Sequence, residues 1–509
     1  MTAPPTTEPA VTPDPLRESQ ISRTTRNLTA VAISTILANG LHFVWITILA
    51  RLIGAETFGL WSKITAFVGI ASALPEFSSN LIVLRDVAQR PKDAGKYLSA
   101  TLVMQPLLGL VAAIGLIIVS LILPNDSETR ILLAIASLSL IIDSLGTMGH
   151  NQLLAIEQMT LMSVITVVHK VALVALALLA VLGGAGLVGV YVVTIGAGLF
   201  RAALYWWALR RHGIRPQWPV TREMITYMFR SSWPIGLSIL LQVTYRYINS
   251  LIVATVLGNT ENGYFGAAFT IVFGIIELSS STVLVALSPL MSRLASSQRD
   301  QLRALVDNFA FLTIALALPL GVGISLLAGK LSALLFPGFL GTAAILEIMI
   351  WQGVFAMVGD IYSQALVVQD KQNVVFLIRV GGIVSNLALN ALLLPYFESA
   401  RGAALASLGA QIVMVGWMLV DYRPDSAAIQ RFGGRLIRVL VAGVGMSAVI
   451  ILLQNANLFV AGLIGVAVYG AAILILRAFA PEHWQLAANV ARAVPGIGPT
   501  LGRLITRLA

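Results

Sequence analysis

The 509-residue chain is 57% hydrophobic and only 11% charged, whereas a soluble domain carries about 25% charged residues. Apolar segments recur from residue 28 to residue 478, and a helix that crosses a membrane needs about 20 such residues. The composition therefore predicts an all-α polytopic membrane protein. It argues against a soluble enzyme and against a nucleic-acid-binding protein, although the net charge is +10.

Fourteen apolar segments are long enough to form membrane-spanning helices. In chain order they are residues 28–50, 58–84, 97–123, 131–151, 160–182, 185–209, 233–257, 263–291, 307–329, 341–367, 373–396, 401–421, 434–454 and 457–478. Pro75 is expected to kink the second span, because an internal proline removes a helical hydrogen bond. Residues 1–27 are expected to form a disordered tail, because their first part is rich in Pro and Thr.

The distribution of Lys and Arg orients these spans. If the N-terminus is cytoplasmic, 24 Lys and Arg residues lie near the cytoplasmic ends of the helices and four lie near the external ends. The four external residues are Arg51, Arg130, Lys330 and Arg401. Because short cytoplasmic loops of membrane proteins are enriched in Lys and Arg, the sequence predicts that both termini are cytoplasmic.

An internal repeat is visible at an offset of 204 residues. The stretch ARLIGAETFGLW at 50–61 aligns without gaps with ATVLGNTENGYF at 254–265. The alignment pairs Gly54 with Gly258 and Gly59 with Gly263. We expect these glycines to serve tight turns between consecutive spans. Parallel repeats related by an axis along the membrane normal are a transporter architecture.

The repeat predicts a division of the chain into two six-helix lobes, residues 28–209 and 233–421. A basic cytoplasmic connector, residues 210–232, would join the lobes. Two more helices within 434–478 fall outside the repeat. Residues 479–509 mix Arg with apolar residues and are expected to form an amphipathic tail on the anionic cytoplasmic leaflet.

Five cationic residues lie inside the predicted spans, namely Lys63, Lys170, Arg201, Arg246 and Arg379. Each costs roughly 2.5–3.5 kcal/mol at the centre of a membrane helix, so a water-filled cavity or a charged partner must compensate. An alternative for Lys63 and Arg201 is that their long side chains extend to the membrane interface. An alternative for Lys170 is a structural pairing with Asp143.

Polar residues share helix faces with several of these cations. The seventh span carries Gln242, Tyr245, Arg246 and Asn249 at a spacing that places them on one face. Similar faces carry Asn39 with His42, Arg379 with Asn386 and Asn390, and Gln352 with Asp360 and Ser363.

We therefore expect one cationic cavity that binds an anionic substrate, because guanidinium groups present forked donors to phosphate or carboxylate oxygens. The expected lining is Arg246, Lys63, Arg379, Lys170, Arg201, His42, Asn39, Tyr245 and Asn249. The carboxylates expected to bind a coupling ion or proton are Asp360, Asp143 and Glu277. Asp360 fits equally well as a counter-charge to an arginine.

Features of an enzyme or a cofactor site are missing from the sequence. The chain has no Cys and its five His show no metal-ligand spacing. It contains no GxxxxGK[ST] nucleotide-binding motif. The predicted external loops, such as residues 183–186, are too short to hold a catalytic domain. We expect no catalytic residues, no metal and no cofactor.

The run LARLIGAETFGLWSKITAFVGIAS at 49–72 resembles the junction of the first two helices in Wzx-type flippases. These belong to the multidrug/oligosaccharidyl-lipid/polysaccharide exporter superfamily. The repeat copy at 254–274 has the same form. The resemblance implies two six-helix bundles around a central cavity that work by alternating access in the bacterial cytoplasmic (inner) membrane.

The same resemblance implies a substrate and partners. The substrate would be a polyprenyl-diphosphate-linked oligosaccharide for O-antigen or exopolysaccharide synthesis, with its lipid tail in the bilayer. It would move from the inner to the outer leaflet, driven by an ion or proton gradient. A polysaccharide polymerase and a chain-length regulator are implied partners, and no nucleic acid is.

Two other activities within the superfamily remain alternatives. A lipid II flippase of peptidoglycan synthesis would have a similar span count, a similar cationic cavity and the additional pair of helices. A multidrug antiporter that exports cations would need an acidic cavity, whereas the first span here carries Asn39 and His42 but no acid. The sequence leaves the glycan and the coupling ion open.

Overall fold

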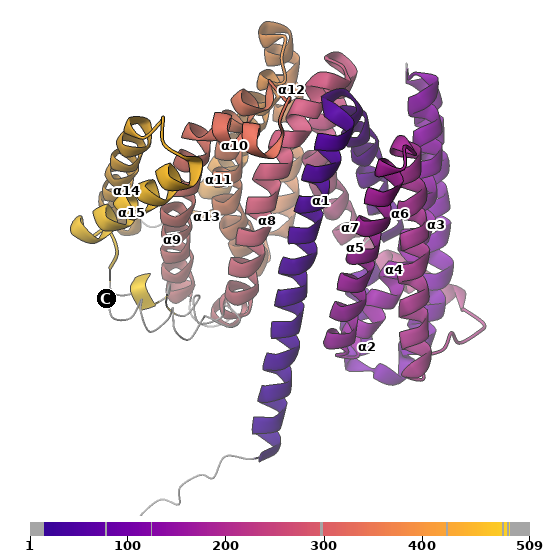
Figure 1. Ribbon diagram of the computed structural model, residues 1–509. Coiled ribbons are helices and arrows are strands. Elements are labelled where there is room, and N and C mark those ends of the chain that lie inside the picture. Colours follow the sequence, from indigo (N-terminus) through magenta and orange to yellow (C-terminus); the bar gives the residue numbers. More distant parts are fainter. Residues whose placement is uncertain are drawn as a thin grey trace, which may run out of the picture.

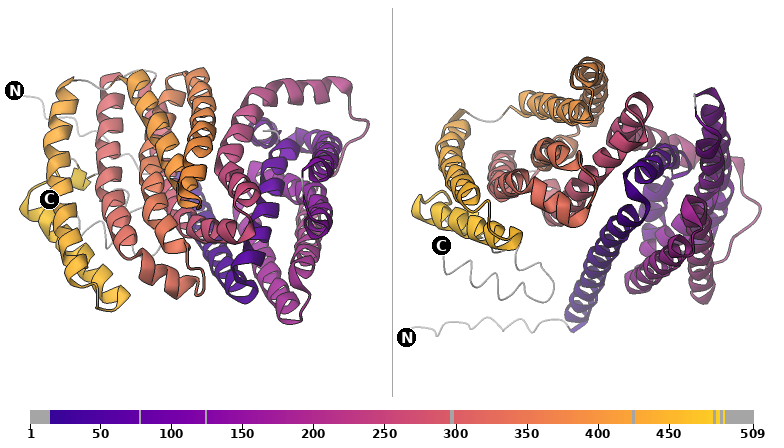
Figure 2. Two further views of the ribbon diagram at one scale, coloured as in Figure 1. Left: turned by 90° about the horizontal axis from the view of Figure 1, so that it is seen from above. Right: turned by 45° about the horizontal axis from the view of Figure 1, so that its top comes forward.

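The computed structural model describes residues 15–76, 79–123, 125–295, 299–423, 426–480, 483–485 and 488. Within these residues the protein is built from helices and contains no strand. The helices run roughly side by side and form two lobes, with α14 and α15 on the far side of the second lobe (Figure 1, Figure 2). The structure confirms the predicted all-α polytopic fold.

The first lobe contains the helices up to α6. They are α1 (Pro15–Glu76), α2 (Ser79–Gln89), the short 3-10 helix η1 (Pro91–Asp93), α3 (Ala94–Ile122), α4 (Ser127–Ala155), α5 (Met159–Leu182) and α6 (Gly186–Arg211). The helix α1 is two helices joined at Gly54, whose φ of 76° is not helical. Its two parts match the first two predicted spans. Pro75 lies inside the second part, and residues 77–78 lie outside the described residues, so the expected kink at Pro75 stays a prediction.

The second lobe and the additional pair follow in the same order. They are α7 (Arg222–Val256), α8 (Asn259–Ala295), α9 (Arg299–Leu326), the short α10 (Ala328–Leu335), α11 (Thr342–Val368), α12 (Gln372–Phe397), α13 (Arg401–Tyr422), α14 (Ser426–Leu452) and α15 (Leu458–Ile475). The pair α14–α15 packs against α9. Phe311, Ala442 and Tyr469 lie in the apolar core of this contact.

The helices agree closely with the predicted spans. Twelve helical segments among the described residues are long and apolar enough to cross a membrane. One of them, Ile33–Gln89, covers most of the first predicted span and all of the second. The eighth predicted span corresponds to α8.

Two predicted boundaries are wrong. The helix α1 begins at Pro15, inside the segment 1–27 that we expected to be disordered. Proline is tolerated in the first turn of a helix, and residues 16–27 contain neither Gly nor Pro to interrupt the helix. Residues 1–14 lie outside the described residues. The connector is also shorter than 210–232, because α6 continues to Arg211 and α7 begins at Arg222.

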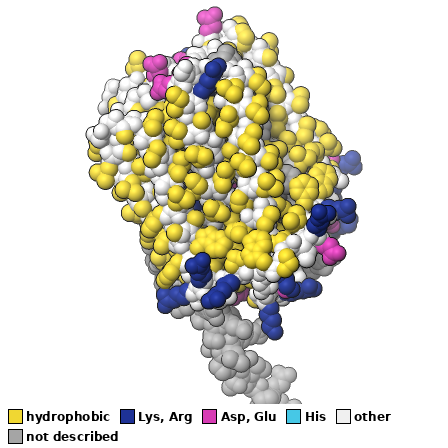
Figure 3. Space-filling view, turned by 90° about the vertical axis from the view of Figure 1, so that its right-hand side faces the viewer, with side chains coloured by type: hydrophobic (Ala, Val, Ile, Leu, Met, Phe, Trp, Pro, Cys, Tyr) yellow, Lys and Arg dark blue, Asp and Glu magenta, His cyan; other side chains and the backbone are white. Residues whose placement is uncertain are grey.

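The surface has the polarity of a membrane protein. Large aliphatic side chains such as Ile122 (76% exposed) and Leu392 (68% exposed) stand outward. On the side of the first lobe, hydrophobic side chains cover a broad middle zone, and most Lys and Arg gather at one end (Figure 3). A band of this kind is far larger than the apolar patches of soluble monomers, and it fits lipid contact.

The repeated glycines lie where the two lobes meet, which we call the Gly54 end of the molecule. Gly54 and Gly258 have φ of 76° and 89°, a conformation that glycine adopts without steric cost. Both glycines therefore serve turns, as the repeat predicts.

Gly59 and Gly263 have a role that the sequence did not reveal. They let α1 and α8 cross with their backbones in contact. A Cβ atom on Gly59 would lie 1.7 Å from the carbonyl oxygen of Asn259, and one on Gly263 would lie 2.0 Å from that of Ala55. Any side chain at either position would separate the lobes.

Side chains reinforce this crossing. Phe58 of the first lobe is fully buried and packs against Phe336 and Phe339 of the second lobe, with ring centroids 6.4 and 5.8 Å away. The amide of Asn262 donates a 2.7 Å hydrogen bond to the carbonyl oxygen of Gly59. Arg51 donates to the carbonyl oxygens at the end of α10, including that of Leu335 at 2.9 Å. The lobes share one apolar core at this end.

Candidate functional site

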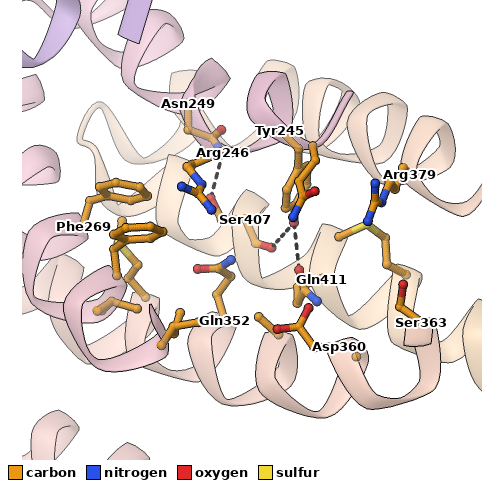
Figure 4. Close-up of a pocket in the computed structure, with 18 of the residues that line it drawn as sticks. Tyr245, Arg246, Asn249, Phe269, Gln352, Asp360, Ser363, Arg379, Ser407 and Gln411 are labelled. Carbon is orange, nitrogen blue, oxygen red and sulfur yellow. Dashed lines mark hydrogen bonds between the residues drawn. The ribbon is translucent and has the colours of Figure 1, made fainter. Parts of the chain in front are cut away.

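A cavity of about 400 Å³ lies within the second lobe. The described residues that line it all belong to the second lobe and come from α7, α8, α11, α12 and α13. Polar groups of Gln352, Asp360, Ser363 and Gln411 line it together with aromatic side chains of α8 (Figure 4). The volume lies in the range of small-molecule sites, roughly 300–1,000 Å³.

One wall of the cavity is the polar face of α7. Gln242, Tyr245, Arg246 and Asn249 all line it, as their helical spacing predicts. The Tyr245 hydroxyl donates to Oε1 of Gln411 at 3.3 Å.

Amide side chains fix α7 to its neighbours. Asn249 donates to the hydroxyl of Ser407 on α13 at 3.0 Å. Asn249 also accepts a 2.8 Å hydrogen bond from Asn390 on α12. Asn386 and Asn390 are buried behind the cavity wall and are linked to each other by a 3.0 Å hydrogen bond. This network holds the position of α7, and therefore of Arg246, relative to α12 and α13.

Arg246 has an unusual environment for a cation inside a membrane protein. Its guanidinium carbon lies 4.3 Å from the centroid of the Phe273 ring, within the range of a cation–π contact. The guanidinium makes no hydrogen bond or ion pair with any residue that the structure describes. Arg246 lines the cavity, and its donors have no partner among the residues that the structure describes (Figure 4).

Two further charged residues line the same cavity. Asp360 comes from α11 and Arg379 from α12. The Arg379 guanidinium donates a 3.1 Å hydrogen bond to the carbonyl oxygen of Ser238 on α7 and interacts electrostatically with Asp360. Asp360 is the one carboxylate among the described lining residues. Among the described lining residues, two guanidinium groups therefore face one carboxylate, so their summed charge is positive.

The cations of the first lobe form a separate group. Arg201 on α6 donates to the Asp143 carboxylate on α4 at 2.8 Å and to the Asp143 carbonyl oxygen at 3.2 Å. Gly146 makes room for the guanidinium, because a Cβ atom there would lie 2.6 Å from Nε of Arg201. The direct ion-pair partner of Asp143 is thus Arg201.

Lys170 and His42 extend this group, which does not reach the cavity. Lys170 on α5 interacts electrostatically with Asp143 and Arg201, and His42 on α1 interacts with Lys170. Asn39 is half-buried and lies one turn from His42. None of these residues lines the cavity of the second lobe.

Lys63 lies apart from both groups. It is 7% exposed, and its ammonium donates a 2.8 Å hydrogen bond to Asn125 in the connection between α3 and α4. The side chain of Glu277 lies outside the described residues.

The residues that we expected to line a single cavity thus lie in separate places. Of its nine expected lining residues, Tyr245, Arg246, Asn249 and Arg379 lie together, and Asp360 joins them.

Some lining residues were not predicted from the sequence. Phe269 and Phe273 form the aromatic wall, and Ser407 and Gln411 contribute from α13. The spacing of Phe265, Phe269 and Phe273 places them on one helix face. An apolar face in a membrane helix does not by itself indicate a site, because lipid-facing and core faces look the same.

Comparisons with known proteins give a family and a fold. A family model described as "Polysaccharide biosynthesis protein" matches residues 24–295. No curated protein sequence matches the chain.

Several solved structures have the same fold. A lipid II flippase MurJ in an inward closed conformation has a TM-score of 0.70 at 16% identity, over 87% of this chain and 98% of that chain. An inward-facing multidrug resistance MATE family transporter of the MOP superfamily has a TM-score of 0.58 at 14% identity, over 80% of this chain and 99% of that chain. A MATE protein in a bent conformation has a TM-score of 0.53 at 16% identity, over 82% and 97% of the two chains. At such identities the likeness establishes the fold alone.

Proposed function

Because the chain belongs to the polysaccharide biosynthesis protein family, whose model covers more than half of it, we propose that it is a lipid-linked oligosaccharide flippase. It moves a polyprenyl-diphosphate-linked oligosaccharide from the inner to the outer leaflet of the bacterial inner membrane. The substrate serves the synthesis of O-antigen or exopolysaccharide. The chain acts as a transporter of the MOP superfamily and not as an enzyme, and a polysaccharide polymerase and a chain-length regulator act with it.

The observation that carries this proposal is the guanidinium of Arg246, which lines the cavity and has no hydrogen-bond or ion-pair partner among the described residues. A cation within a membrane-spanning helix is costly and rare, so the presence of Arg246 there calls for a function. An arginine with free donors binds phosphate or carboxylate oxygens in bidentate geometry. The anionic head group of a lipid-linked oligosaccharide provides such oxygens.

The contact between the lobes supports transport by alternating access. The lobes join at the Gly54 end through backbone contact between α1 and α8. The opposite end carries most of the Lys and Arg on the visible face (Figure 3), and by the positive-inside rule it faces the cytoplasm. In this arrangement the external side is closed, and both termini are cytoplasmic. The transport cycle then requires α1 and α8 to separate.

An ion or proton gradient drives the cycle in this proposal. Asp360 in the cavity and Asp143 in the first lobe are the two carboxylates that we assign to coupling, and Glu277 is a third candidate. Asp143 is held by Arg201 at 2.8 Å, so protonation of the carboxylate would release the guanidinium. Release of the guanidinium would couple the protonation of Asp143 to a conformational change in the first lobe.

A second candidate function is lipid II transport in peptidoglycan synthesis. The similarity to MurJ over 87% of the chain favours it, as does the additional pair α14–α15. A multidrug antiporter is less well supported, because the cavity carries two arginines and a single described carboxylate, whereas an exported cation would need acidic groups.

Native mass spectrometry of the detergent-extracted protein tests these functions. A co-purified polyprenyl diphosphate that carries repeat-unit sugars would support the proposal and identify the glycan. A bound mass equal to lipid II would move the assignment to peptidoglycan synthesis. If neither lipid binds, and organic cations are transported by the protein in proteoliposomes, the proposal is wrong.

A further inference from the structure

We propose that His150 on α4 is a proton-binding residue of the first lobe, and that Tyr205 on α6 orients it to accept the proton at Nε2. The inference rests on the proposed function, because it adds a residue to the coupling between transport and a proton gradient. It goes beyond the pair formed by Asp143 and Arg201, since it assigns a second group through which that pair responds to pH.

His150 and Asp143 lie on one face of α4, opposite two residues of α6. They are seven residues apart, which is about two helical turns. Arg201 donates to the Asp143 carboxylate at 2.8 Å, and the hydroxyl of Tyr205 lies 3.0 Å from Nδ1 of His150. Gly149 makes this approach possible, because a Cβ atom there would lie 2.4 Å from Cβ of Tyr205. The contact between α4 and α6 therefore brings a titratable ring to the same face as the ion pair.

The direction of each hydrogen bond around Tyr205 follows from the carbonyl acceptor at the end of the chain of bonds. The Thr166 hydroxyl on α5 donates to the carbonyl oxygen of Met162 at 2.9 Å. A hydroxyl has one hydrogen, so Thr166 accepts from the Tyr205 hydroxyl, whose oxygen lies 3.1 Å away. Tyr205 has then used its own hydrogen. Nδ1 of His150 must therefore donate to the Tyr205 oxygen.

This hydrogen bond leaves Nε2 of His150 as the basic nitrogen. In a neutral imidazole one nitrogen is a donor and the other an acceptor, whereas both are donors in the imidazolium ion. A proton that arrives from water binds the lone pair of Nε2, and Nδ1 donates to Tyr205 before and after. Histidine is also the side chain whose unperturbed charge change falls between pH 5 and 8. His150 therefore changes its charge without losing the bond that positions it.

His150 lies near the end of the molecule that carries the basic connector. It precedes Ala155, the last residue of α4, by five residues, a rise of about 7.5 Å along a helix. Ala155 belongs to an apolar cluster with Val87 and Met228, and Ile214 of the connector packs against this cluster. The His150 side chain is partly exposed. In the orientation proposed above, this end faces the cytoplasm, and the proton exchanges with that side.

The charges near His150 determine what its proton does. Arg201 interacts electrostatically with His150. Among the described residues, the other titratable groups that interact with Arg201 are Asp143 of α4, Glu76 of α1, His169 and Lys170 of α5, and Tyr205 of α6. A proton on His150 places a second positive charge near Arg201, and like charges repel. Proton uptake therefore favours a conformation in which Arg201 lies farther away, and protonation of Asp143 releases Arg201 to move there.

NMR spectroscopy tests the hydrogen-bond assignment on the full chain in lipid nanodiscs, with the histidine rings labelled with ¹⁵N. The chain has five histidines, and the signals that disappear in His150→Asn identify His150. We expect the neutral ring to carry its hydrogen on Nδ1. Tyr205→Phe removes the acceptor and should shift the ring to the form protonated at Nε2. A wild-type His150 that carries its neutral hydrogen on Nε2 would overturn the assignment.

Reconstituted transport with and without an imposed proton gradient tests the role in coupling. His150→Asn is the matched variant, because Nδ2 of asparagine replaces Nδ1 as a donor to Tyr205 but the side chain does not titrate. The gradient should speed flipping by the wild type about fivefold or more, and by the variant less than about twofold. His212→Asn is the control, because His212 is exposed directly after α6, and it should keep the full stimulation. Full stimulation of His150→Asn, or an equal loss in His212→Asn, would overturn the role of His150.

The two measurements separate this inference from the proposed function. If the wild type flips a lipid-linked oligosaccharide and a proton gradient leaves the rate unchanged, the inference is wrong while the flippase function stands. If the NMR spectra show the Nδ1–H ring and its dependence on Tyr205, but the wild type flips no lipid-linked oligosaccharide, the proton-accepting nitrogen is assigned correctly and the function is wrong.

Discussion

The two lobes share a repeated fold, but an arginine within the spans of one lobe has a different environment from one in the other. In the first lobe, Arg201 is neutralised by Asp143 at 2.8 Å. In the second lobe, Arg246 has no such partner among the described residues and faces a cavity. The repeat offset places His42 of the first lobe at the position of Arg246. The two copies of the repeated fold thus differ. The first lobe holds an arginine that is paired with a carboxylate, and the second holds an arginine that has no ion-pair partner among the described residues.

This difference indicates a division of roles. A paired charge can respond to a proton without any ligand, because protonation of the carboxylate alone breaks the pair. An unpaired guanidinium can respond only to an incoming anion. We therefore assign the response to the gradient mainly to the first lobe and the binding of the substrate to the second.

The largest expected effect comes from joining the lobes covalently. A Cβ atom on Gly266 of α8 would lie 3.3 Å from Cβ of Ser62 on α1, close to the Cβ separation of a disulfide, about 3.5–4.5 Å. The chain has no cysteine, so the double variant Ser62→Cys, Gly266→Cys introduces a single pair. We expect oxidation to abolish transport completely and reduction to restore it.

The controls for this experiment are the two single-cysteine variants, which should transport equally well with and without oxidant. Mass spectrometry of the intact protein checks that the disulfide forms. Full transport by the oxidised, cross-linked protein would show that α1 and α8 need not separate at this point.

The substitution Arg246→Ala should abolish transport while the protein still inserts and folds. No ion pair with a described residue is broken, so the midpoint of thermal unfolding in detergent should change little. Complementation of a flippase-deficient strain measures transport, and Arg401→Ala provides the control because Arg401 is exposed at the start of α13. Normal surface polysaccharide with the Arg246 variant would remove this residue from the substrate site.

The substitution Asp143→Asn should have a smaller effect on transport but a larger one on stability. It leaves the Arg201 guanidinium uncompensated, and breaking a fully buried ion pair costs about 3–5 kcal/mol. The Asp143 side chain is 49% exposed, so we expect a lower loss of roughly 1–2 kcal/mol in the free energy of unfolding.

A double variant completes this test. Replacing Arg201 with Gln in the Asp143→Asn background should recover most of the stability, because no unpaired charge remains. Asp300→Asn, at an exposed position in the first turn of α9, is the matched control. If the double variant is as unstable as the sum of both single variants, the pair makes no energetic contribution of its own.

The smallest effect is expected for Asp360→Asn. The change is isosteric and leaves Arg246 in place, so substrate binding should persist while transport is slowed or uncoupled from the gradient. The flipping rate in proteoliposomes, with and without an imposed proton gradient, measures this. An unchanged ratio of the two rates would exclude Asp360 from coupling.

The sequence was sufficient to predict the helices because lipid imposes a length and a composition on every span. The turns at Gly54 and Gly258 also followed from the repeat. The polar face of α7 was predicted correctly, because helical spacing alone places Arg246 beside Asn249. The N-terminal boundary was wrong, because the Pro- and Thr-rich first part of the tail was extended as disorder to residue 27, while nothing in residues 16–27 prevents a helix.

The chain itself determined which residues are cationic, which helix faces are polar and that the fold is duplicated. Only the tertiary structure decided which of these charges are satisfied. Arg201 and Arg246 both look like unpaired cations in the sequence, and they differ because α4 brings Asp143 to one while α8 brings Phe273 to the other. Helical periodicity specifies the face on which a side chain stands, but the packing of helices distant in sequence determines what that face meets.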